Sequence, residues 1–218
     1  MSLKLDQRVI QILKNFSTIN PSILIKPGNT LSTLSPVKSI MAKAKTTVNF
    51  EKEFAIYDLS RFLSAISLME DPSLEVMDSF IVIKSGSNTI NYTLTDPSLI
   101  VTAPDEIKNN FTKSISFSLT NDNISSVIRG MSVLKLPEIA INGNGSVIKL
   151  QAVDSKNPSG DVFSMELGET AENFNTIIKS ENLKLLPGDY SVTITNRLVK
   201  FESDELTYWV AVEANSTI

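Results

Sequence analysis

Cysteine and histidine are both absent from the 218 residues of this chain, and their absence excludes many kinds of reactive site. A chain without cysteine forms no disulfide and offers no thiolate, which fits a protein that stays in a reducing cytoplasm. A chain without histidine lacks the Ser-His-Asp and Cys-His nucleophilic sites and the imidazole ligands of most zinc enzymes. We therefore expect no cofactor, no metal and no catalytic residue, and an enzyme is the weakest class of function for this sequence.

Long apolar runs and phosphate-binding glycine motifs are missing as well. No run approaches the roughly 20 apolar residues that span a bilayer, and the N-terminus has no apolar signal segment, so we expect no membrane partner. Neither a P-loop nor a dinucleotide fingerprint occurs, and the glycine-rich stretch Asn142–Gly145 lies between strand-like runs, which indicates a hairpin turn. Carboxylate pairs such as Glu70-Asp71 fall at turns, where a solvated loop is favoured over an acid–base pair.

Helical spacing of apolar residues occurs in four segments, at about Lys4–Phe16, Leu59–Met69, Asn121–Lys135 and Lys179–Leu186. Asp58 precedes the second segment as an N-cap, and Pro187-Gly188 ends the short fourth segment. In the third segment the apolar face, which we expect to be buried, consists of Ile124, Val127, Ile128, Met131 and Leu134.

Short strand-like runs, separated by turn signals such as Pro27-Gly28 and Ser85-Gly86, fill most of the remaining sequence. They predict the α+β class, with antiparallel sheets covered by helices on one face. The two halves follow one plan, since the segment that starts at Phe54 returns in altered form at Phe174. We expect two similar domains with two helices each, at residues 1–95 and 113–218, joined by a connector at residues 96–112.

The connector carries two prolines, Pro97 and Pro104, on either side of an apolar triplet, Leu99–Val101. If the triplet is exposed, it is a docking strip for partner peptides. The alternative, that it packs onto a sheet, is equally open at this point.

Basic side chains are concentrated on the predicted helices, although the chain has 20 basic and 24 acidic residues and a net charge of -4. The four helical segments hold eight basic and three acidic residues, and small serines such as Ser60, Ser64 and Ser125 share their polar faces. One interpretation is an ordinary solvated face. The other is a surface that touches a polyanion loosely while the acidic remainder of the chain repels it.

Four stretches of the sequence resemble a known family, and they are LKNFSTIN (Leu13–Asn20), FAIYDLSRFL (Phe54–Leu63), LPGDY (Leu186–Tyr190) and YWVAVEANST (Tyr208–Thr217). In order and spacing they are similar to the sliding clamps of T-even-type bacteriophages, which are DNA polymerase processivity factors. The resemblance implies the DNA clamp fold and a homotrimeric ring whose helices surround double-stranded DNA. It also implies a replicative DNA polymerase and an ATP-driven clamp loader as partners, in the cytoplasm of an infected bacterium.

The resemblance further assigns three groups of residues. The expected DNA-facing residues are Lys4, Arg8, Lys14, Arg61, Arg129, Lys135, Lys179 and Lys184. The expected partner-peptide pocket consists of Val37, Leu99, Ile100, Leu198 and Trp209. The expected subunit interface pairs Ile90, Tyr92 and Leu94 of one subunit with Phe163, Met165 and Leu167 of the next. Ordinary core packing remains open for Trp209 and for these six interface residues.

A second class of function also fits a β-rich chain with basic helices. In that alternative the protein is a trimeric viral structural or assembly protein, and its basic helices face only solvent. The two classes differ in their behaviour on DNA, because only a clamp persists on a closed circle and slides off once the circle is linearised.

Overall fold

The computed structural model describes residues 3–107 and 114–218, which form two compact units, one in each half of the chain. We call them the N-terminal unit and the C-terminal unit. Residues 108–112 of the predicted connector lie outside the described residues. The limits predicted for the two domains and for the connector stay a prediction.

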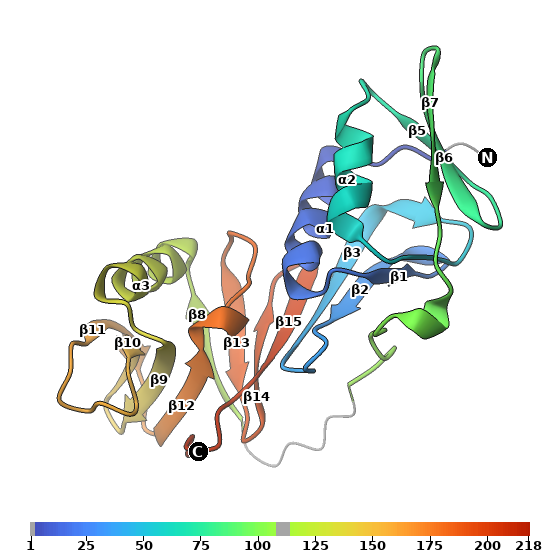
Figure 1. Ribbon diagram of the computed structural model, residues 1–218. Coiled ribbons are helices and arrows are strands. Elements are labelled where there is room, and N and C mark those ends of the chain that lie inside the picture. The colour runs from blue at the N-terminus through green and yellow to red at the C-terminus, as the bar shows by residue number, and fades with distance from the viewer. Residues whose placement is uncertain (1–2, 108–113) are drawn as a thin grey trace. The chain divides into compact units, whose positions relative to one another are not determined.

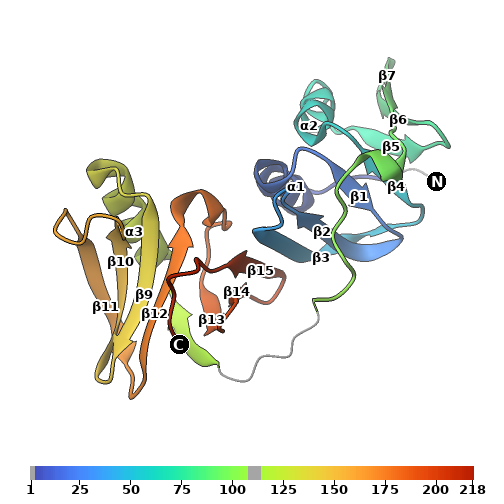
Figure 2. The same cartoon turned by 60° about the horizontal axis from the view of Figure 1, so that its bottom comes forward.

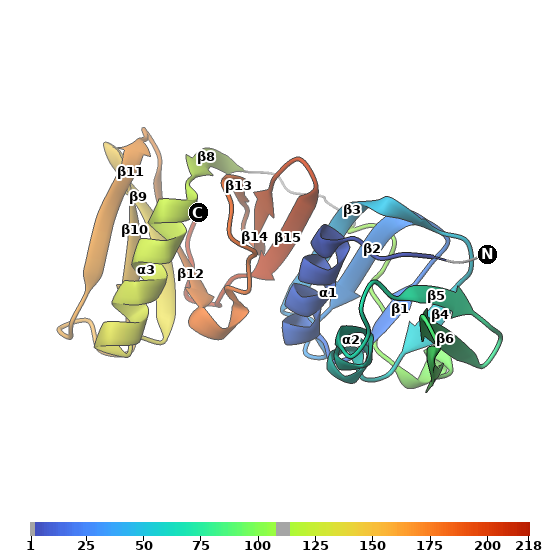
Figure 3. The ribbon, with the colours of Figure 1, turned by 90° about the horizontal axis from the view of Figure 1, so that it is seen from above.

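The described residues of the N-terminal unit form two helices and seven strands. Their order along the chain (Figure 1) is α1 (Gln7–Ile19), β1 (Ile23–Ile25), β2 (Gly28–Leu34), β3 (Ile40–Phe50), β4 (Phe54–Ile56), α2 (Leu59–Ser67), β5 (Ser73–Val76), β6 (Phe80–Ser85) and β7 (Asn88–Thr93), followed by the 3-10 turn η1 (Pro97–Leu99). All strand pairs are antiparallel: β1 with β4, β2 with β3, and β6 with both β5 and β7. Helix α1 packs on β2 and β3, and α2 lies beside α1 and against β7 (Figure 3).

The C-terminal unit contains β8 (Ile115–Leu119), α3 (Asn121–Leu134), β9 (Glu138–Asn144), β10 (Val147–Val153), β11 (Phe163–Glu169), β12 (Asn173–Lys179), the 3-10 turn η2 (Ser180–Asn182), β13 (Tyr190–Ile194), β14 (Leu198–Glu202) and β15 (Leu206–Ala211). One antiparallel sheet has the order β11-β10-β9-β12, and the other strands lie in the order β15-β14-β13-β8. Helix α3 packs on one face of the first sheet, against β10 and β11 (Figure 2).

Capping side chains fix where the helices begin. The carboxylate of Asp6 accepts the backbone N–H of Val9 at 2.8 Å, and that of Asp58 accepts the N–H of Arg61 at 2.9 Å, so two otherwise unpaired N–H groups are satisfied. Thr120 and Asn123 form a capping box at the start of α3. The N-cap predicted at Asp58 is thereby confirmed.

Apolar residues at helical spacing then bury one face of each helix. The buried face of α1 consists of Val9, Ile12, Leu13, Phe16 and Ile19, and that of α2 consists of Leu59, Phe62, Leu63 and Ile66. Together with alternate residues of the strands, these faces make the core of the N-terminal unit. The structure thus confirms the predicted α+β class with antiparallel sheets.

The internal repeat predicted from Phe54 and Phe174 is also confirmed by the order of elements. Phe54 begins β4, which is followed by a helical element and then by β5, β6 and β7. Phe174 lies in β12, which is followed by the turn η2 and then by β13, β14 and β15.

The fourth predicted helix, at about Lys179–Leu186, is wrong. Lys179 is the last residue of β12, and only Ser180–Asn182 form a single 3-10 turn, for which Lys179 provides no side-chain cap. The segment is too short to recover the cost of nucleating an α-helix, and the ring of Pro187 disfavours helical dihedrals at Leu186. The C-terminal unit therefore has one α-helix in its described residues instead of two.

Two smaller expectations also need correction. Helix α1 begins at Gln7, because Asp6 caps it, and Lys4 precedes the helix. Ile128 was expected to be buried but is 38% exposed. Ile124, Val127 and Met131 form the buried stripe of α3, and Ile128 lies at its border, where its side chain reaches solvent.

The cap at Asp6 gives a pH-dependent prediction. Hydrogen bonds from the Thr47 hydroxyl and from the Val9 N–H hold the pKa of the Asp6 carboxyl below its ordinary value. Asp6→Ala should lower the free energy of unfolding by about 1 kcal/mol at neutral pH. The carboxylate contributes its stability above the pKa of the unfolded chain and loses it as pH falls through the lowered folded pKa. The difference between wild type and variant should therefore shrink as the pH falls below about 4.

Urea unfolding followed by circular dichroism over this pH range measures the difference. Thr47→Val is the matched control, because it removes one of the hydrogen bonds that lower the Asp6 pKa and should move the loss of stability to higher pH. A difference that stays constant from neutral to acidic pH would contradict the assignment.

Candidate functional site

The described helices carry basic side chains on the faces that point away from the sheets. The three helices contain four basic residues, which are Arg8 and Lys14 on α1, Arg61 on α2 and Arg129 on α3. They contain one acidic residue, Asp122 on α3. Lys14, Arg61 and Arg129 are exposed, and Arg8 is half-buried with its guanidinium donating to Gln11 at 3.2 Å. Because α1 and α2 lie side by side, the cations of the N-terminal unit share one helix layer.

Serine hydroxyls between these cations are turned back onto their own helices. Ser17 donates to the carbonyl of Lys14 at 2.7 Å, Ser64 to that of Ser60 at 2.8 Å, and Ser132 to that of Ile128 at 3.0 Å. Such bonds to the preceding turn satisfy the hydroxyls within the helix. The polar faces are therefore short and smooth, with positive charge but few outward hydrogen-bond donors.

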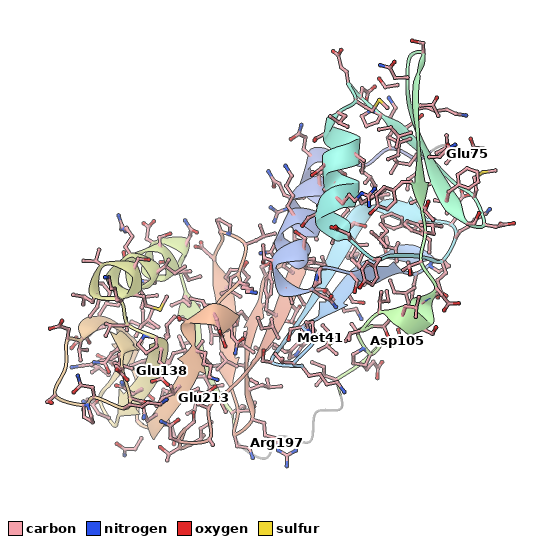
Figure 4. All side chains as sticks on the ribbon, in the orientation of Figure 1. Met41, Glu75, Asp105, Glu138, Arg197 and Glu213 are labelled. Atoms are coloured by element: carbon pink, nitrogen blue, oxygen red, sulfur yellow. The ribbon has the colours of Figure 1, made fainter. Side chains whose placement is uncertain are left out.

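The other four residues expected to face DNA lie outside the helices. Lys4 forms an ion pair with Asp71, and Lys179 lies 3.9 Å from a carboxylate oxygen of Glu213 (Figure 4 labels Glu213). Lys135 is the C-cap of α3 in the left-handed region, with φ 54°, and Lys184 is half-buried after η2. The sequence argument placed all eight residues on helices, and the structure confirms this for Arg8, Lys14, Arg61 and Arg129.

The chain covers one of the two outer edges of the three-stranded sheet β5-β6-β7, and one of the two outer edges of the four-stranded sheet β11-β10-β9-β12. Leu3 exchanges two backbone hydrogen bonds with Leu74 and so covers the outer edge of β5. Near the C-terminus, Thr217 does the same with Asn175 and covers β12. Within residues 3–107 and 114–218, no strand pairs with the outer edges of β7 and β11. Unpaired N–H and C=O groups therefore remain along the outer edges of β7 and β11.

Both uncovered strands present apolar residues at alternate positions. Ile90, Tyr92 and Leu94 are half-buried in the N-terminal unit, and Phe163, Met165 and Leu167 are half-buried in the C-terminal unit. Several of them also contact their own unit. The ring of Tyr92 meets Phe62 edge-on at 5.1 Å, its hydroxyl donates to the Asp58 carbonyl, and the Asn123 amide reaches the sulfur of Met165.

A shallow apolar groove lies beside β11, between that strand and α3. Its volume is about 430 Å³, and its lining is Ser126, Arg129, Gly130, Val133, Leu134 and Phe163. Val133 is 78% exposed at this groove, on a helix position that ordinarily carries a polar residue. Sequence reasoning missed Val133 and Gly130, although a valine on the polar face of a predicted helix was a usable signal.

The first half of the connector is held on the N-terminal unit at several points. The Asn20 side-chain amide donates to the carbonyls of Leu34 and Val101, at 2.8 Å and 3.1 Å. Further along, Lys26 forms an ion pair with Asp105 at 2.6 Å, and Lys43 donates to the Asp105 backbone carbonyl at 3.3 Å. Sequence reasoning did not identify Asn20, because its role depends on contacts with distant segments.

The residues expected in a partner-peptide pocket fall on both units. In the N-terminal unit Val37 is 82% exposed, Leu99 is 68% exposed and Ile100 is half-buried, so this part of the apolar triplet is not packed away. In the C-terminal unit Leu198 and Trp209 share one face of the β14–β15 pair, because Trp209 stands opposite Lys200 and Leu198 is two residues before Lys200. Trp209 is half-buried, and Tyr208 and Val210 take the core positions beside it.

The residues described above do not form a catalytic site. In the part of the chain that the structure describes, no group of acidic side chains is placed as metal ligands would be, and no helix is long and apolar enough to cross a membrane. Basic helix faces, uncovered strand edges and exposed apolar residues are features of a protein that assembles and binds.

This fold and these surfaces define the class of DNA sliding clamps. Residues 4–102 match the family model described as DNA polymerase processivity factor, and residues 116–214 match the model described as gp45 sliding clamp, C terminal. The chain is 30% identical to the sliding clamp of Escherichia phage RB69 over 99% of both chains. It is 28% identical to that of Vibrio phage KVP40 over 97% of this chain and 100% of that one.

Solved structures of similar fold come from other clamps. The PCNA of A. fulgidus, bound to the C-terminal region of FEN-1, has a TM-score of 0.67 at 15% identity, with 99% of each chain covered. The DNA polymerase III subunit beta of Pseudomonas aeruginosa has a TM-score of 0.68 at 10% identity over 97% of this chain. The chain spans only 64% of the length of that bacterial subunit.

The chain belongs to the bacteriophage family of sliding clamps, the DNA polymerase processivity factors. It is thus a non-enzymatic factor that works with DNA and a polymerase as part of a multimeric clamp. The comparisons favour this class over the viral structural protein, as the resemblance of the sequence had implied.

The contact between Gly130 and Phe163 gives a second prediction. Replacing glycine by alanine inside a helix ordinarily stabilises it by about 1 kcal/mol. Here a Cβ at residue 130 would lie 2.5 Å from Cγ of Phe163 and 2.9 Å from its Cβ, so the β11 residue must move. Gly130→Ala should therefore destabilise the C-terminal unit, by about 1–3 kcal/mol.

Chemical denaturation of four proteins checks this: wild type, Gly130→Ala, Phe163→Ala and the double variant. The second substitution should remove most of the cost of the first, which a double-mutant cycle reports as coupling. Ser132→Ala, on the exposed face of the same helix, is the control and should change stability by less than about 0.5 kcal/mol. A stabilised Gly130→Ala protein would refute the close contact.

Proposed function

We propose that three copies of this chain close into a ring around double-stranded DNA, and that the ring tethers the replicative polymerase by topology instead of by tight DNA contacts. The observation that carries this proposal is the pair of uncovered strand edges, one in each unit. Strand β7 of one subunit pairs with strand β11 of the next, head to tail, and three such joints complete the ring. A head-to-tail interface of this kind closes when the rotation between subunits divides the circle.

The sequence of β7 supports its role as a pairing edge. Natural edge strands are ordinarily protected from pairing by charged residues, prolines or short length. Strand β7 spans Asn88–Thr93 and contains neither a charged residue nor a proline. Ile90, Tyr92 and Leu94 then meet Phe163, Met165 and Leu167 across the joint, in the manner of β-augmentation.

The groove beside β11 extends this joint. It lies between α3 and β11, is lined chiefly by apolar side chains such as Val133 and Phe163, and is about 430 Å³ in volume. An apolar side chain from the neighbouring subunit fills it, and the exposed Val133 becomes buried. Burial of apolar surface is the main source of stability in such interfaces.

The helix faces supply the inner wall of the proposed ring. Arg8, Lys14, Arg61 and Arg129 attract the phosphate backbone without reading sequence, since phosphate contacts position a protein but do not specify bases. The inward-bonded serines offer few additional donors to DNA. Lys4, Lys135, Lys179 and Lys184 complete the proposed DNA-facing set from outside the helices. Modest positive charge with smooth surfaces keeps each contact weak, so that the ring slides.

A pocket for short partner peptides completes the proposal. It consists of Val37, Leu99 and Ile100 with Leu198 and Trp209, of which Val37 and Leu99 are strongly exposed. Large apolar patches that reach solvent favour partner binding, and tryptophan is a common anchor in protein interfaces. The fold neighbour that holds the C-terminal region of FEN-1 supports a peptide tail as the occupant. Polymerase and clamp-loader tails are the proposed ligands.

A closed ring cannot thread onto circular DNA by itself, so an ATP-driven clamp loader is proposed to open one joint. The relatives are bacteriophage proteins. We accordingly place the ring in the cytoplasm of an infected bacterium.

A single exposed residue tests the subunit joint. Val133→Asp should leave the fold of the C-terminal unit intact, because the side chain is 78% exposed, yet it places a charge in the groove that the neighbour fills. We expect the trimer to dissociate at concentrations where wild type is assembled, with a loss of about tenfold or more in the association constant. Sedimentation or mass photometry measures the assembly.

Val37→Asp is the matched control, since it introduces the same charge at a site of 82% exposure away from the proposed joint. It should weaken binding of partner tails but leave the trimer assembled. Trimers of undiminished stability in Val133→Asp would exclude the groove from the interface. A wild-type protein that is monomeric at all working concentrations would exclude the ring.

Charge reversal tests the inner wall. The double variant Lys14→Glu/Arg61→Glu, at two exposed helix positions outside the groove lining, should keep the trimer but lower polymerase run length roughly tenfold, because each subunit then repels phosphates where it had attracted them. Retention on nicked circular DNA, followed by release when the circle is cut, separates loading from sliding.

The control for this variant is Lys52→Glu/Lys156→Glu, which changes the net charge equally on exposed loops outside the helices. It should load and slide like wild type. Equal losses in both double variants would mean that overall charge matters and the helix faces do not.

A further inference from the structure

A small cavity beside the connector combines two lysines with two hydroxyl-bearing side chains. Its volume is about 180 Å³, and its polar lining residues include Lys26, Lys43, Thr30 and Ser32. The register of the β2–β3 pair places Ser32 opposite Lys43, so hydroxyl and ammonium groups stand side by side on one sheet face. Positive charge gathers here although the chain as a whole is acidic.

The cavity already holds a carboxylate from the same chain. The Asp105 side chain lies 2.6 Å from the Lys26 ammonium, and Lys43 donates to the Asp105 carbonyl at 3.3 Å (Figure 4 labels Asp105). The hydrogen bond and charge of Lys26 lower the pKa of the Asp105 carboxyl, with a smaller contribution from Lys43. Lys26 therefore binds a carboxylate here, and Lys43 places a second positive charge beside it.

The ion pair is open to exchange with other carboxylates. The Asp105 side chain is 80% exposed and that of Lys26 is 42% exposed. Exposed ion pairs contribute little stability, so a competing carboxylate that is tethered nearby displaces Asp105 at little cost. High local concentration from a second attachment point is sufficient for such an exchange.

An attachment point lies next to the cavity on the same unit. Ser32 in the lining is two residues, about 7 Å, from Leu34 along β2. Asn20 joins the carbonyl of Leu34 to that of Val101 in the connector. The exposed Leu99 and Val37 belong to these same two segments. A peptide whose apolar residues rest there brings its next few residues to the lysines.

We infer that Lys26 and Lys43 form a carboxylate site for the acidic residues or the C-terminal carboxylate of a bound partner tail, and that Asp105 occupies this site in cis until the tail displaces it. This inference rests on the proposed partner-peptide pocket and names the charge of the peptide that the pocket selects. Asp105 thus competes with the partner tail for the lysines, and it also holds the connector on the N-terminal unit.

The test uses two versions of one probe, a fluorescent peptide with the C-terminal sequence of the cognate replicative polymerase. One version keeps its carboxylates, and in the other every side-chain and terminal carboxylate is an amide. Fluorescence anisotropy with the full chain at low ionic strength should show the carboxylate version bound about two- to fivefold more tightly. Lys26→Gln should abolish this preference, and Lys43→Gln should weaken it. Lys45→Gln, on the neighbouring position of the same sheet face but outside the cavity lining, should retain it.

The change in peptide affinity caused by Asp105→Asn tells whether Asp105 competes with the peptide or only holds the connector in place. Removal of the competing carboxylate should increase affinity for the carboxylate peptide about twofold or more and leave the amide peptide unchanged. A variant that binds both peptides more weakly would overturn the inference, because Asp105 would then only hold the connector.

The remaining outcomes are equally decisive. Equal binding of the two peptides by wild type overturns the carboxylate site but leaves the proposed pocket standing, and Val37→Asp should then still weaken both peptides. Binding of neither peptide overturns the pocket and the site together. If a duplex oligonucleotide competes for the site in a Lys43-dependent manner while the carboxylate peptide does not, the lysines serve nucleic acid and the inference is wrong.

Discussion

Backbone hydrogen bonding at the sheet edges is the constraint on which the architecture depends. Every strand edge that is not paired exposes N–H and C=O groups that bind another strand readily. The chain covers one edge in each unit with its own end segments, through Leu3 at β5 and Thr217 at β12. It leaves β7 and β11 uncovered in the described residues. In the proposed trimer each uncovered edge satisfies the other, so the same backbone chemistry that builds the sheets also assembles the ring.

Charge is distributed so that assembly and DNA contact do not compete. The helices hold the cations Arg8, Lys14, Arg61 and Arg129, while the chain as a whole is acidic. Serine hydroxyls on these faces bond to their own helices, so the faces present charge and little else. In a ring that holds DNA by enclosure, weak contacts of this kind are an advantage, since strong ones would stop it from moving. Most exposed apolar side chains lie outside the helices, as Val37 and Leu99 do, whereas Val133 lies on α3 at the groove beside β11.

Local sequence patterns predicted most of the fold because they report local physics. The spacing of Val9, Ile12 and Phe16 indicates a helix with one buried face, and the structure has that helix. The repeated segments at Phe54 and Phe174 predicted matching places in the two halves. The same reasoning failed at Lys179–Leu186, where the pattern resembled a helix. No side chain caps that segment, and β12 takes its first residue. The competition between a strand and a short helix depends on pairing with β9, which the local pattern does not contain.

For the candidate site, the sequence alone identified residue types and faces: basic residues on helices, alternating apolar residues on two strands, and an apolar triplet in the connector. Only the folded chain decided which of these meet. Asn20 and Val101 are 81 positions apart, and Lys26 and Asp105 are 79 apart, yet each pair is joined by a hydrogen bond. Gly130 and Phe163 touch because α3 lies on β11. The physical reason is that periodicity fixes the direction in which a side chain points, whereas contacts between distant segments depend on how all the packed elements fit together at once.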